Sequence, residues 1–330
     1  MPTTPRPGSQ QWLGLAKETT YGTPVATPTM WIPVDSPKWE PKVTPLVDQA
    51  LRGYMGTDYG QTQGMRYDEL SYKTMIYADS IFPHLIAILG GADTLTGAAD
   101  PYTHATSLNN AASTTLNGQP PSYTGFLYQL DGKVVQIPGM IISGLKISIK
   151  ANTLPTVDAT WMGLPGAFIT APTNTPSTVP PMPPFTTSIT VGGVAATKYS
   201  DCSLDIKRAA EAVPVLNGSQ SPLSIFAGPL SVSGSLLAIY EGSTDADLVR
   251  LLANTQPTLS VAIYQQGDAT HPLTLQCSKI AYDSSAPAGS NSSYATISSN
   301  FKALMNTTDA LDGKLSPIKA TILNAQSTAY

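Results

Sequence analysis

The chain has 330 residues, enough for two compact β domains, and 18 Lys and Arg residues against 22 Asp and Glu give a formal net charge of −4. This balance argues against a dedicated nucleic-acid-binding protein, which needs a concentrated basic face, but it allows a surface that nucleic acid only passes. Charged residues make up 12% of the chain, about half the usual share. Such a surface does little to oppose self-association, so it is typical either of an assembling subunit or of a secreted β protein rich in Thr and Ser.

Residues 1–10 are rich in proline and polar side chains and lack the apolar core of a signal peptide. No apolar run approaches the roughly 20 residues that a membrane helix needs. We therefore expect a protein that is made in the cytoplasm and has no membrane segment.

Alternating apolar and polar residues predict β-strands in the first half of the chain. At residues 144–150, Leu145 and Ile147 share one face while Lys146 and Ser148 share the other, as in a half-buried strand. An amphipathic helix that covers one face of a sheet is expected at residues 79–89, between a capping Asp79-Ser80 pair and the stop at Gly90-Gly91. The expected order is a strand around Trp39, a glycine-rich loop at 52–68, a strand at 70–78, the helix, and strands at 123–130, 140–150 and 156–162.

The expected loop at residues 52–68 alternates glycines with aromatic and methionine side chains. Glycine gives such a loop conformational freedom, and large side chains give it area to bury against a partner. The alternative is a flexible loop in solvent. We favour an assembly contact, made by Arg52, Tyr54, Met55, Tyr59, Met65 and Tyr67.

Residues 163–184 are crowded with prolines, which cannot donate a regular hydrogen-bond ladder and make a stiff, extended spacer. A domain boundary is therefore expected near residue 180. We divide the chain into an N-terminal arm at 1–35, a first domain at 36–165, a proline-rich linker at 166–190 and a second domain at 191–330.

The second half repeats the order of elements seen in the first half. Strands are expected at 202–208, 230–240, 259–265, 273–281 and 294–305, with a helix at 245–254 after the second of them. A shared order of elements indicates an internal duplication. Cys202 and Cys277 stand in alternating runs without metal or redox spacing, so buried free thiols are favoured over a disulfide.

No constellation of residues predicts a reaction. His84, His104 and His271 each lack a second ligand at metal-binding spacing. No nucleophile elbow or phosphate-binding loop is present either. We therefore predict no catalytic residue, no cofactor and no metal, and the enzyme class is the least favoured.

One short motif carries a family resemblance. The run from Trp12 to Pro24, which reads WLGLAKETTYGTP, resembles the opening of phage tail tube proteins, the major tail proteins of long-tailed, siphovirus-like bacteriophages. In that family a proline- and threonine-containing segment and an aromatic strand follow, as residues 29–34 do here. The sharp motif covers residues 12–34, although the order of later elements agrees with the family over most of the chain.

The resemblance implies a mainly β protein with two tandem β-sandwich or half-barrel tail-tube domains, each with one short helix. Family members join their sheets into rings, and the rings stack into a tube through long loops and terminal arms. Here those contacts would include Trp12 and Tyr21 in residues 1–29, together with the loop at 52–68. Single-domain members form rings of six, so a duplicated chain is expected to close with three copies; a homohexamer stays open if the repeat is only apparent.

The resemblance also implies partners and a location. The lumen would hold the tape-measure protein and then conduct DNA without binding it specifically, while tail terminator and tail-tip proteins would close the ends. The protein would be made in the host bacterial cytoplasm and reside in the virion tail. A β-sandwich adhesin or carbohydrate-binding module is the alternative, in which exposed aromatic side chains would form a binding platform.

Overall fold

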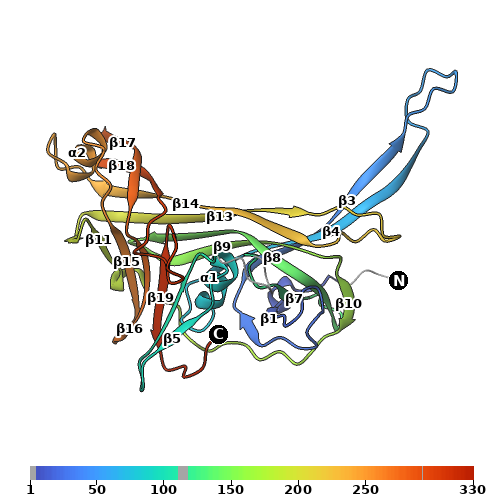
Figure 1. Cartoon of the computed structure of the whole chain (residues 1–330), viewed down its shortest axis with the longest axis horizontal. Coiled ribbons are helices and arrows are strands. Elements are labelled where there is room, and N and C mark those ends of the chain that lie inside the picture. The colour runs from blue at the N-terminus through green and yellow to red at the C-terminus, as the bar shows by residue number, and fades with distance from the viewer. Residues whose placement is uncertain (1–4, 111–117, 292) are drawn as a thin grey trace.

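The structure is a computed structural model that describes residues 5–110, 118–291 and 293–330 (Figure 1). Residues 1–4 of the predicted arm lie outside the described residues. The fold is mainly β, with a 12-stranded sheet and a 7-stranded sheet in which the strands pair antiparallel. The described residues also contain two α-helices, α1 and α2. The predicted mainly β class with two short helices is therefore confirmed, whereas the two tandem domains stay a prediction.

The bounds of the elements follow in chain order. The first half holds η1 (Gly8–Gln10), β1 (Leu13–Lys17), β2 (Met30–Ile32), β3 (Asp35–Asp48), β4 (Gly60–Met75), α1 (Ile81–Leu89), β5 (Thr94–Thr96), β6 (Tyr102–Ser107), β7 (Tyr123–Tyr128), β8 (Lys133–Lys150), β9 (Thr153–Gly163) and β10 (Ala167–Thr170). The second half holds η2 (Pro184–Thr186), β11 (Ser188–Val191), β12 (Val194–Ala196), β13 (Tyr199–Ala212), β14 (Ile225–Ile239), α2 (Ala246–Leu252), β15 (Leu259–Gln265), β16 (Asp268–Cys277), β17 (Ile280–Ser290), β18 (Ser293–Ala303) and β19 (Lys319–Asn324).

The same pattern of strand pairing occurs in both halves. The strands pair in the order β3-β4-β9-β8 in the first half and β13-β14-β18-β17 in the second. Irregularities recur at matching places: the register shift after Ile142 in β8 has a counterpart after Tyr282 in β17. The shift after Val43 in β3 likewise has a counterpart after Arg208 in β13.

A second layer of strands is repeated as well. In the first half β7 pairs with β1 and β8, β1 pairs with β2, and β10 adds to β8. In the second half β15 pairs with β11 and β16, β11 pairs with β12, and β19 adds to β16. We call β1–β4 with β7–β10 the first unit, and β11–β19 the second unit. The hairpin β5–β6 lacks a counterpart among the described strands and pairs with β19, so it extends the sheet of the second unit.

The two units are joined edge to edge where β8 pairs with β13, from Gly144 opposite Lys207 to Lys150 opposite Asp201. The result is one continuous run, β3-β4-β9-β8-β13-β14-β18-β17, which we call the joined sheet. Figure 1 shows β13 and β14 lying across the molecule, with α1 and the second layer on one side of them. Each of the two sheets contains strands from both halves of the chain. The predicted domain boundaries stay a prediction.

Large apolar side chains fill matching positions of the core. Trp161 of β9 lies between Leu70 and Ile142 and is fully buried. Phe301 lies between Gly234 and Tyr282 at the matching place in β18. A Cβ atom at Gly234 would lie 2.5 Å from the Phe301 ring, so glycine makes room for that ring.

Helix α1 differs from the prediction in two respects. It ends as expected, with Gly90 in the left-handed region (φ 76°) donating to the Ile86 carbonyl. The side chain of Ser80, however, makes no capping hydrogen bond. The helix is also buried on nearly all sides rather than on one face, because eight of its residues, from Ile81 to Leu89, are buried. Helix α2 begins after Asp245, whose side chain caps it by accepting from the Asp247 backbone N–H.

Two predicted boundaries were wrong. The glycine-rich segment is not a loop throughout, because β4 begins at Gly60 and residues 60–68 pair with β3. The single strand expected at 273–281 is interrupted between β16 and β17. There the Asp309 carboxylate accepts from the Ser278 backbone N–H (2.6 Å) and hydroxyl (2.7 Å), which redirects the chain from one layer to the other.

Candidate assembly surfaces

The two ends of the joined sheet are unpaired strand edges. Within the described residues, β3 pairs with β4 alone and β17 with β18 alone. Pro41 in β3 and Pro287 in β17 are exposed. Proline at an edge removes a backbone donor, which is one way in which proteins prevent indiscriminate strand pairing.

The joined sheet has one buried face and one polar face. The polar face carries a row of residues that lie opposite each other on successive strands, and charges alternate along most of it. The row consists of Asp35, Lys73, Asp158, Lys146, Asp205, Ser233 and Lys302. Opposite charges in such positions attract each other, while like charges would repel.

Several lysines of this face also make ion pairs. Lys207 Nζ lies 2.7 Å from the Asp205 carboxylate, and Lys302 Nζ lies 3.0 Å from that of Asp283. In the first unit, Lys42 Nζ lies 2.5 Å from the Glu40 carboxylate, at the position that corresponds to Lys207 and Asp205. The polar face therefore presents lysines beside carboxylates rather than a continuous basic patch.

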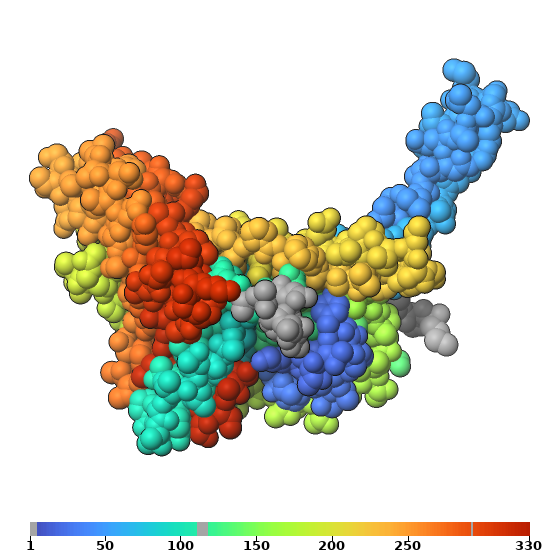
Figure 2. Space-filling model, in the orientation of Figure 1, coloured from blue at the N-terminus to red at the C-terminus, as the bar shows by residue number. Residues whose placement is uncertain are grey.

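The hairpin β3–β4 forms an arm that projects far from the body of the molecule, as Figures 1 and 2 show in blue. Leu51 and Met55 at its tip are fully exposed, and Tyr54 is 79% exposed. Arg52 forms an ion pair with Asp48 and lies 4.6 Å from the centre of the Tyr59 ring. The tip thus gathers Arg52, Tyr54, Met55 and Tyr59, four of the predicted contact residues, on an exposed turn.

The remaining residues predicted in this segment lie elsewhere. Met65 and Tyr67 are in β4 and pack against a small buried cluster that includes Ile141 and Ile225. They help to anchor the base of the arm. The backbone N–H of Arg66 also donates to the Gln220 carbonyl (2.8 Å), which fixes the β13–β14 connection beside that base.

Trp12 and Tyr21 do not lie at the arm tip but in the body. Trp12 stacks on Tyr128 with ring centres 5.6 Å apart. The Tyr21 hydroxyl accepts a hydrogen bond from the Ile225 backbone N–H (2.6 Å), and burial raises the pKa of Tyr21 to about 12. Both residues therefore have contacts within the chain, and their predicted part in assembly stays a prediction.

Glu18 explains why the N-terminal motif has its pattern. Its carboxylate accepts hydrogen bonds from the backbone N–H groups of Gly22 (2.9 Å) and Gly139 (2.8 Å). It also accepts from the hydroxyls of Ser122 (2.7 Å) and Thr124 (2.8 Å). One buried carboxylate thus ties the turn after β1 to the strands beside it, because a buried charge is stable only when such donors surround it.

Comparison with known proteins agrees with this arrangement. The phage tail tube protein family matches residues 8–303, which is nearly the whole chain. The chain belongs to this family. A comparison with curated proteins finds no match. Because it belongs to this family, the protein is a structural component of the phage tail, as the sequence predicted.

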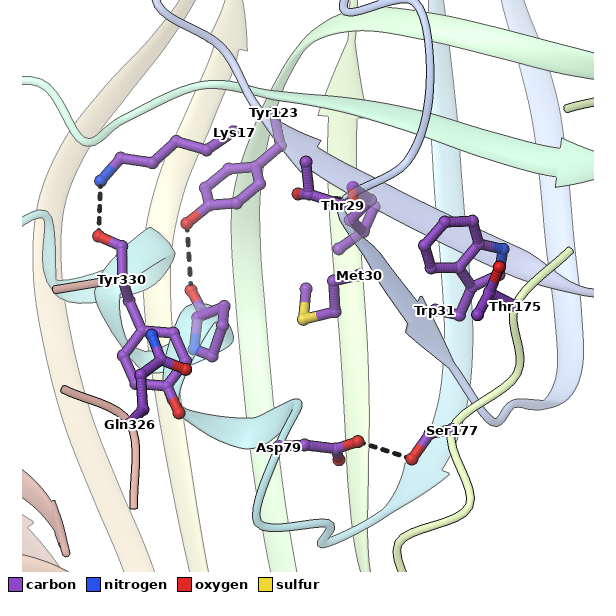
Figure 3. A pocket seen from close by; sticks show the side chains of 12 residues that line it. Lys17, Thr29, Met30, Trp31, Asp79, Tyr123, Thr175, Ser177, Gln326 and Tyr330 are labelled. Atoms are coloured by element: carbon purple, nitrogen blue, oxygen red, sulfur yellow. Dashed lines mark hydrogen bonds between the residues drawn. The ribbon is translucent and has the colours of Figure 1, made fainter. Parts of the chain in front are cut away.

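The tail tube protein also has a cavity of about 500 Å³ between β1, β2 and the start of α1 (Figure 3). Its wall includes Met30, Trp31 and Tyr123. Lys17 donates to the Tyr330 carbonyl (3.1 Å) across one side of it. Ser177, in the proline-rich segment, donates to the Asp79 carboxylate (2.5 Å), so the cavity is bounded by segments from distant parts of the chain.

The titratable residues considered from sequence have structural contacts. His84 and His104 are buried, and His271 lies between Asp100 and Asp268. Cys202 and Cys277 are free and buried, which confirms the expectation, and burial raises the pKa of Cys202 to about 12. In the part of the chain that the structure describes, no three His, Cys, Asp or Glu residues are grouped to hold a metal. No helix there is long and apolar enough to cross a membrane.

Sequence reasoning missed both the free edges and the alternating row. The sequence does show the prolines of the edge strands and the Lys and Asp residues of the row. Which strands are neighbours, however, is set by pairing between residues far apart in the chain, and local periodicity carries no information on that.

Proposed function

We propose that the protein polymerises into stacked rings that form the hollow tube of the phage tail, through which DNA is ejected. The observation that carries this proposal is the joined sheet. Its two units are already connected edge to edge at β8–β13, and the same kind of edge is left open at β3 and β17. Repeating that contact between subunits extends the sheet and closes a ring without leaving a free edge.

The repeated pairing supports a ring of three chains. If the two units are tandem tail-tube domains, each chain supplies two equivalent positions. The rings of six that the family resemblance implies for single-domain members then need three copies. A homohexamer requires instead that the two units occupy non-equivalent positions.

The β3–β4 arm provides the contact between successive rings. Its tip carries exposed Leu51, Tyr54 and Met55 on the turn between β3 and β4, two strands that leave the body. When a partner fully buries an apolar side chain at such a tip, the burial stabilises the contact by about 1.5–3 kcal/mol. Contact with a neighbouring ring would provide that burial and would order the arm.

The polar face of the joined sheet lines the lumen, because α1 and the second layer cover the opposite face. Lysines such as Lys146 and Lys207 lie beside carboxylates on this face. A wall of paired charges releases few counterions when DNA approaches, so DNA passes without being held. Before ejection the tape-measure protein occupies the same space.

The other partners follow from the place of a tube in a tail. Tail terminator and tail-tip proteins meet the two ends of the stack, and assembly takes place in the host bacterial cytoplasm. The protein acts there as a structural subunit and not as an enzyme.

Electron microscopy of the purified protein at high concentration, with native mass measurement, tests this function. Hollow rings or tubes with three chains per ring are expected. Six chains per ring would keep the tube but contradict the equivalence of the two units. A protein that stays monomeric even after addition of preformed tail tips would contradict the proposed function.

A further inference from the structure

We infer that β17 of one subunit pairs with β3 of the next in the register of the internal β8–β13 contact, and that prolines on both edges disfavour the neighbouring registers. In this register Trp39 lies opposite Pro287 and Pro41 lies opposite Ser285. The partner is a second copy of this chain, and the inference rests on the proposed function because it specifies the seam of the proposed ring.

The register comes from the contact that joins the two units within one chain. At β8–β13, Ile147 lies opposite Leu204 and Leu145 opposite Ile206. The matching register shifts make β17 the counterpart of β8 and β3 the counterpart of β13. Pro287 then takes the place of Ile147, and Trp39 takes that of Leu204.

Backbone directions on β17 agree with this transfer. The Tyr240 N–H donates to the Ala295 carbonyl, so Ala295 and every second residue after it in β18 turn their backbone groups towards β14. The residues between them turn towards β17, where they meet Ala286 and Ala288. Pro287, between those two, therefore turns its backbone away from β18 and towards the open edge.

The pairing of β3 with β4 shows which residues of β3 turn their backbone outwards. The Arg66 N–H donates to Gln220 instead of to β3, so the pair of Val43 and Arg66 lacks direct backbone hydrogen bonds. Val43 then turns its backbone outwards, and so do Pro41 and Trp39 by alternation along the strand. Within the chain, Ala151 N–H donates to the Ser200 carbonyl, which places the matching β8–β13 pairs in the hydrogen-bonded class as well.

The prolines disfavour the registers next to the inferred one. In the inferred register the outward pairs are Pro37 with Gly289, Trp39 with Pro287 and Pro41 with Ser285, so each pair contains one proline and keeps one backbone hydrogen bond. A slip of two residues in either direction places Pro287 opposite Pro41 or Pro37. Two pyrrolidine rings would then meet between the strands where hydrogen bonds should form. A slip of one residue would turn the polar face inwards.

Side chains on the polar face suit the same register. Lys38 lies opposite Ala288, Glu40 opposite Ala286 and Lys42 opposite Ser284. Each long charged side chain therefore meets a small one, and no like charges oppose each other. Ala286 and Ala288 are exposed in the single chain, as is Lys38. The seam consequently closes without steric conflict but with half the backbone hydrogen bonds of an ordinary antiparallel pair.

This arrangement gives the edges two properties at once. Free subunits resist random pairing, because their outward donors are partly deleted. In the ring, the same prolines interdigitate and oppose a slip of two residues.

Disulfide cross-linking tests the register directly. Lys38 and Ala288 would form a non-hydrogen-bonded pair with Cα atoms about 4.5 Å apart, within disulfide range. We expect the double variant Lys38→Cys/Ala288→Cys, oxidised after assembly, to give covalent species that increase by one chain up to three. The matched control Lys38→Cys/Ala286→Cys is displaced by two residues, to about 7–8 Å, and should give at least about tenfold less product. The native Cys202 and Cys277 are buried and contribute no background.

The outcomes separate the register from the proposed function. Rings seen by electron microscopy together with cross-linking of the first variant alone support the inference. Rings with preferential cross-linking of the displaced control, or with no cross-linking of either variant, overturn the register and leave the tube intact. Absence of rings from the unmodified protein under the same conditions removes the proposed function, and the seam with it.

Discussion

At the scale of single residues, buried polar groups in this protein are connected into chains that fix the core. Trp161 Nε1 donates to the Tyr72 hydroxyl (3.0 Å), which in turn donates to His84 Nε2 (2.7 Å). His84 Nδ1 donates to the Ser80 carbonyl (2.7 Å). This arrangement requires a neutral imidazole, and burial lowers the pKa of His84 to about 4. His84 thus connects α1 to the joined sheet.

This histidine predicts a pH dependence of stability. Its pKa is lower in the folded protein than the ordinary 6.5, so the unfolded chain binds the proton more readily. The stability it contributes is complete above pH 6.5 and is lost as the pH falls towards 4. We expect the free energy of unfolding of unassembled subunits to fall by about 2 kcal/mol between pH 7 and pH 5. Denaturant titration measures this free energy. The variant His84→Phe should be less stable at pH 7, but its free energy of unfolding should change little between pH 7 and pH 5.

At the scale of elements, the arm is the least supported part of the fold. Beyond the shift at Val43, β3 and β4 form a ribbon with no further strand beside it among the described residues. An isolated pair of strands is marginally stable in water. Its exposed tip therefore gains most from a partner, and changes there should affect stacking more than folding.

Substitution of the arm tip tests this separation. We expect Leu51→Ser/Tyr54→Ser/Met55→Ser to leave the melting temperature within about 2 °C, because these side chains are exposed. Tube length by electron microscopy should fall strongly, while single rings persist. Val194→Ser is a control at an exposed apolar residue, at the start of β12. Tubes of normal length from the triple variant would remove the arm from the stacking contact.

At the scale of the whole molecule, the polar face of the joined sheet combines charges from both units. Asp158 lies opposite Lys146 within the first unit, and Asp205 lies opposite the same lysine from the second. The neutrality of the face thus depends on the pairing of β8 with β13. In a tube, this pairing would determine how strongly the wall interacts with DNA.

Removal of the two carboxylates tests the role of this face. Asp158→Asn/Asp205→Asn leaves Lys146 without the acidic side chains on either side. We expect binding of a short DNA duplex at low salt to increase by roughly tenfold, with a steeper salt dependence, because unpaired lysines release counterions from DNA. Fluorescence anisotropy on subunits measures this. Asp131→Asn/Glu241→Asn makes the same change in net charge away from the joined sheet, and equal binding by both double variants would contradict a special role of this face.

The sequence alone determined the class of the fold and most of its elements. Period-two runs such as residues 144–150 and 202–208 lie in strands, and both helices form, because local periodicity reflects which side chains face the core. The motif from Trp12 to Pro24 led to the correct family. The burial of both cysteines also followed from their place in alternating runs.

Only the tertiary structure decided which strands are neighbours and which edges stay open. The pairing of β8 with β13 and of β6 with β19 brings together residues that are far apart in the chain. Such pairs depend on the closure of long loops and on the packing of whole layers, which no short window of sequence records. For the same reason Met65 and Tyr67 lie at the base of the arm, while Tyr54 and Met55 lie at its tip.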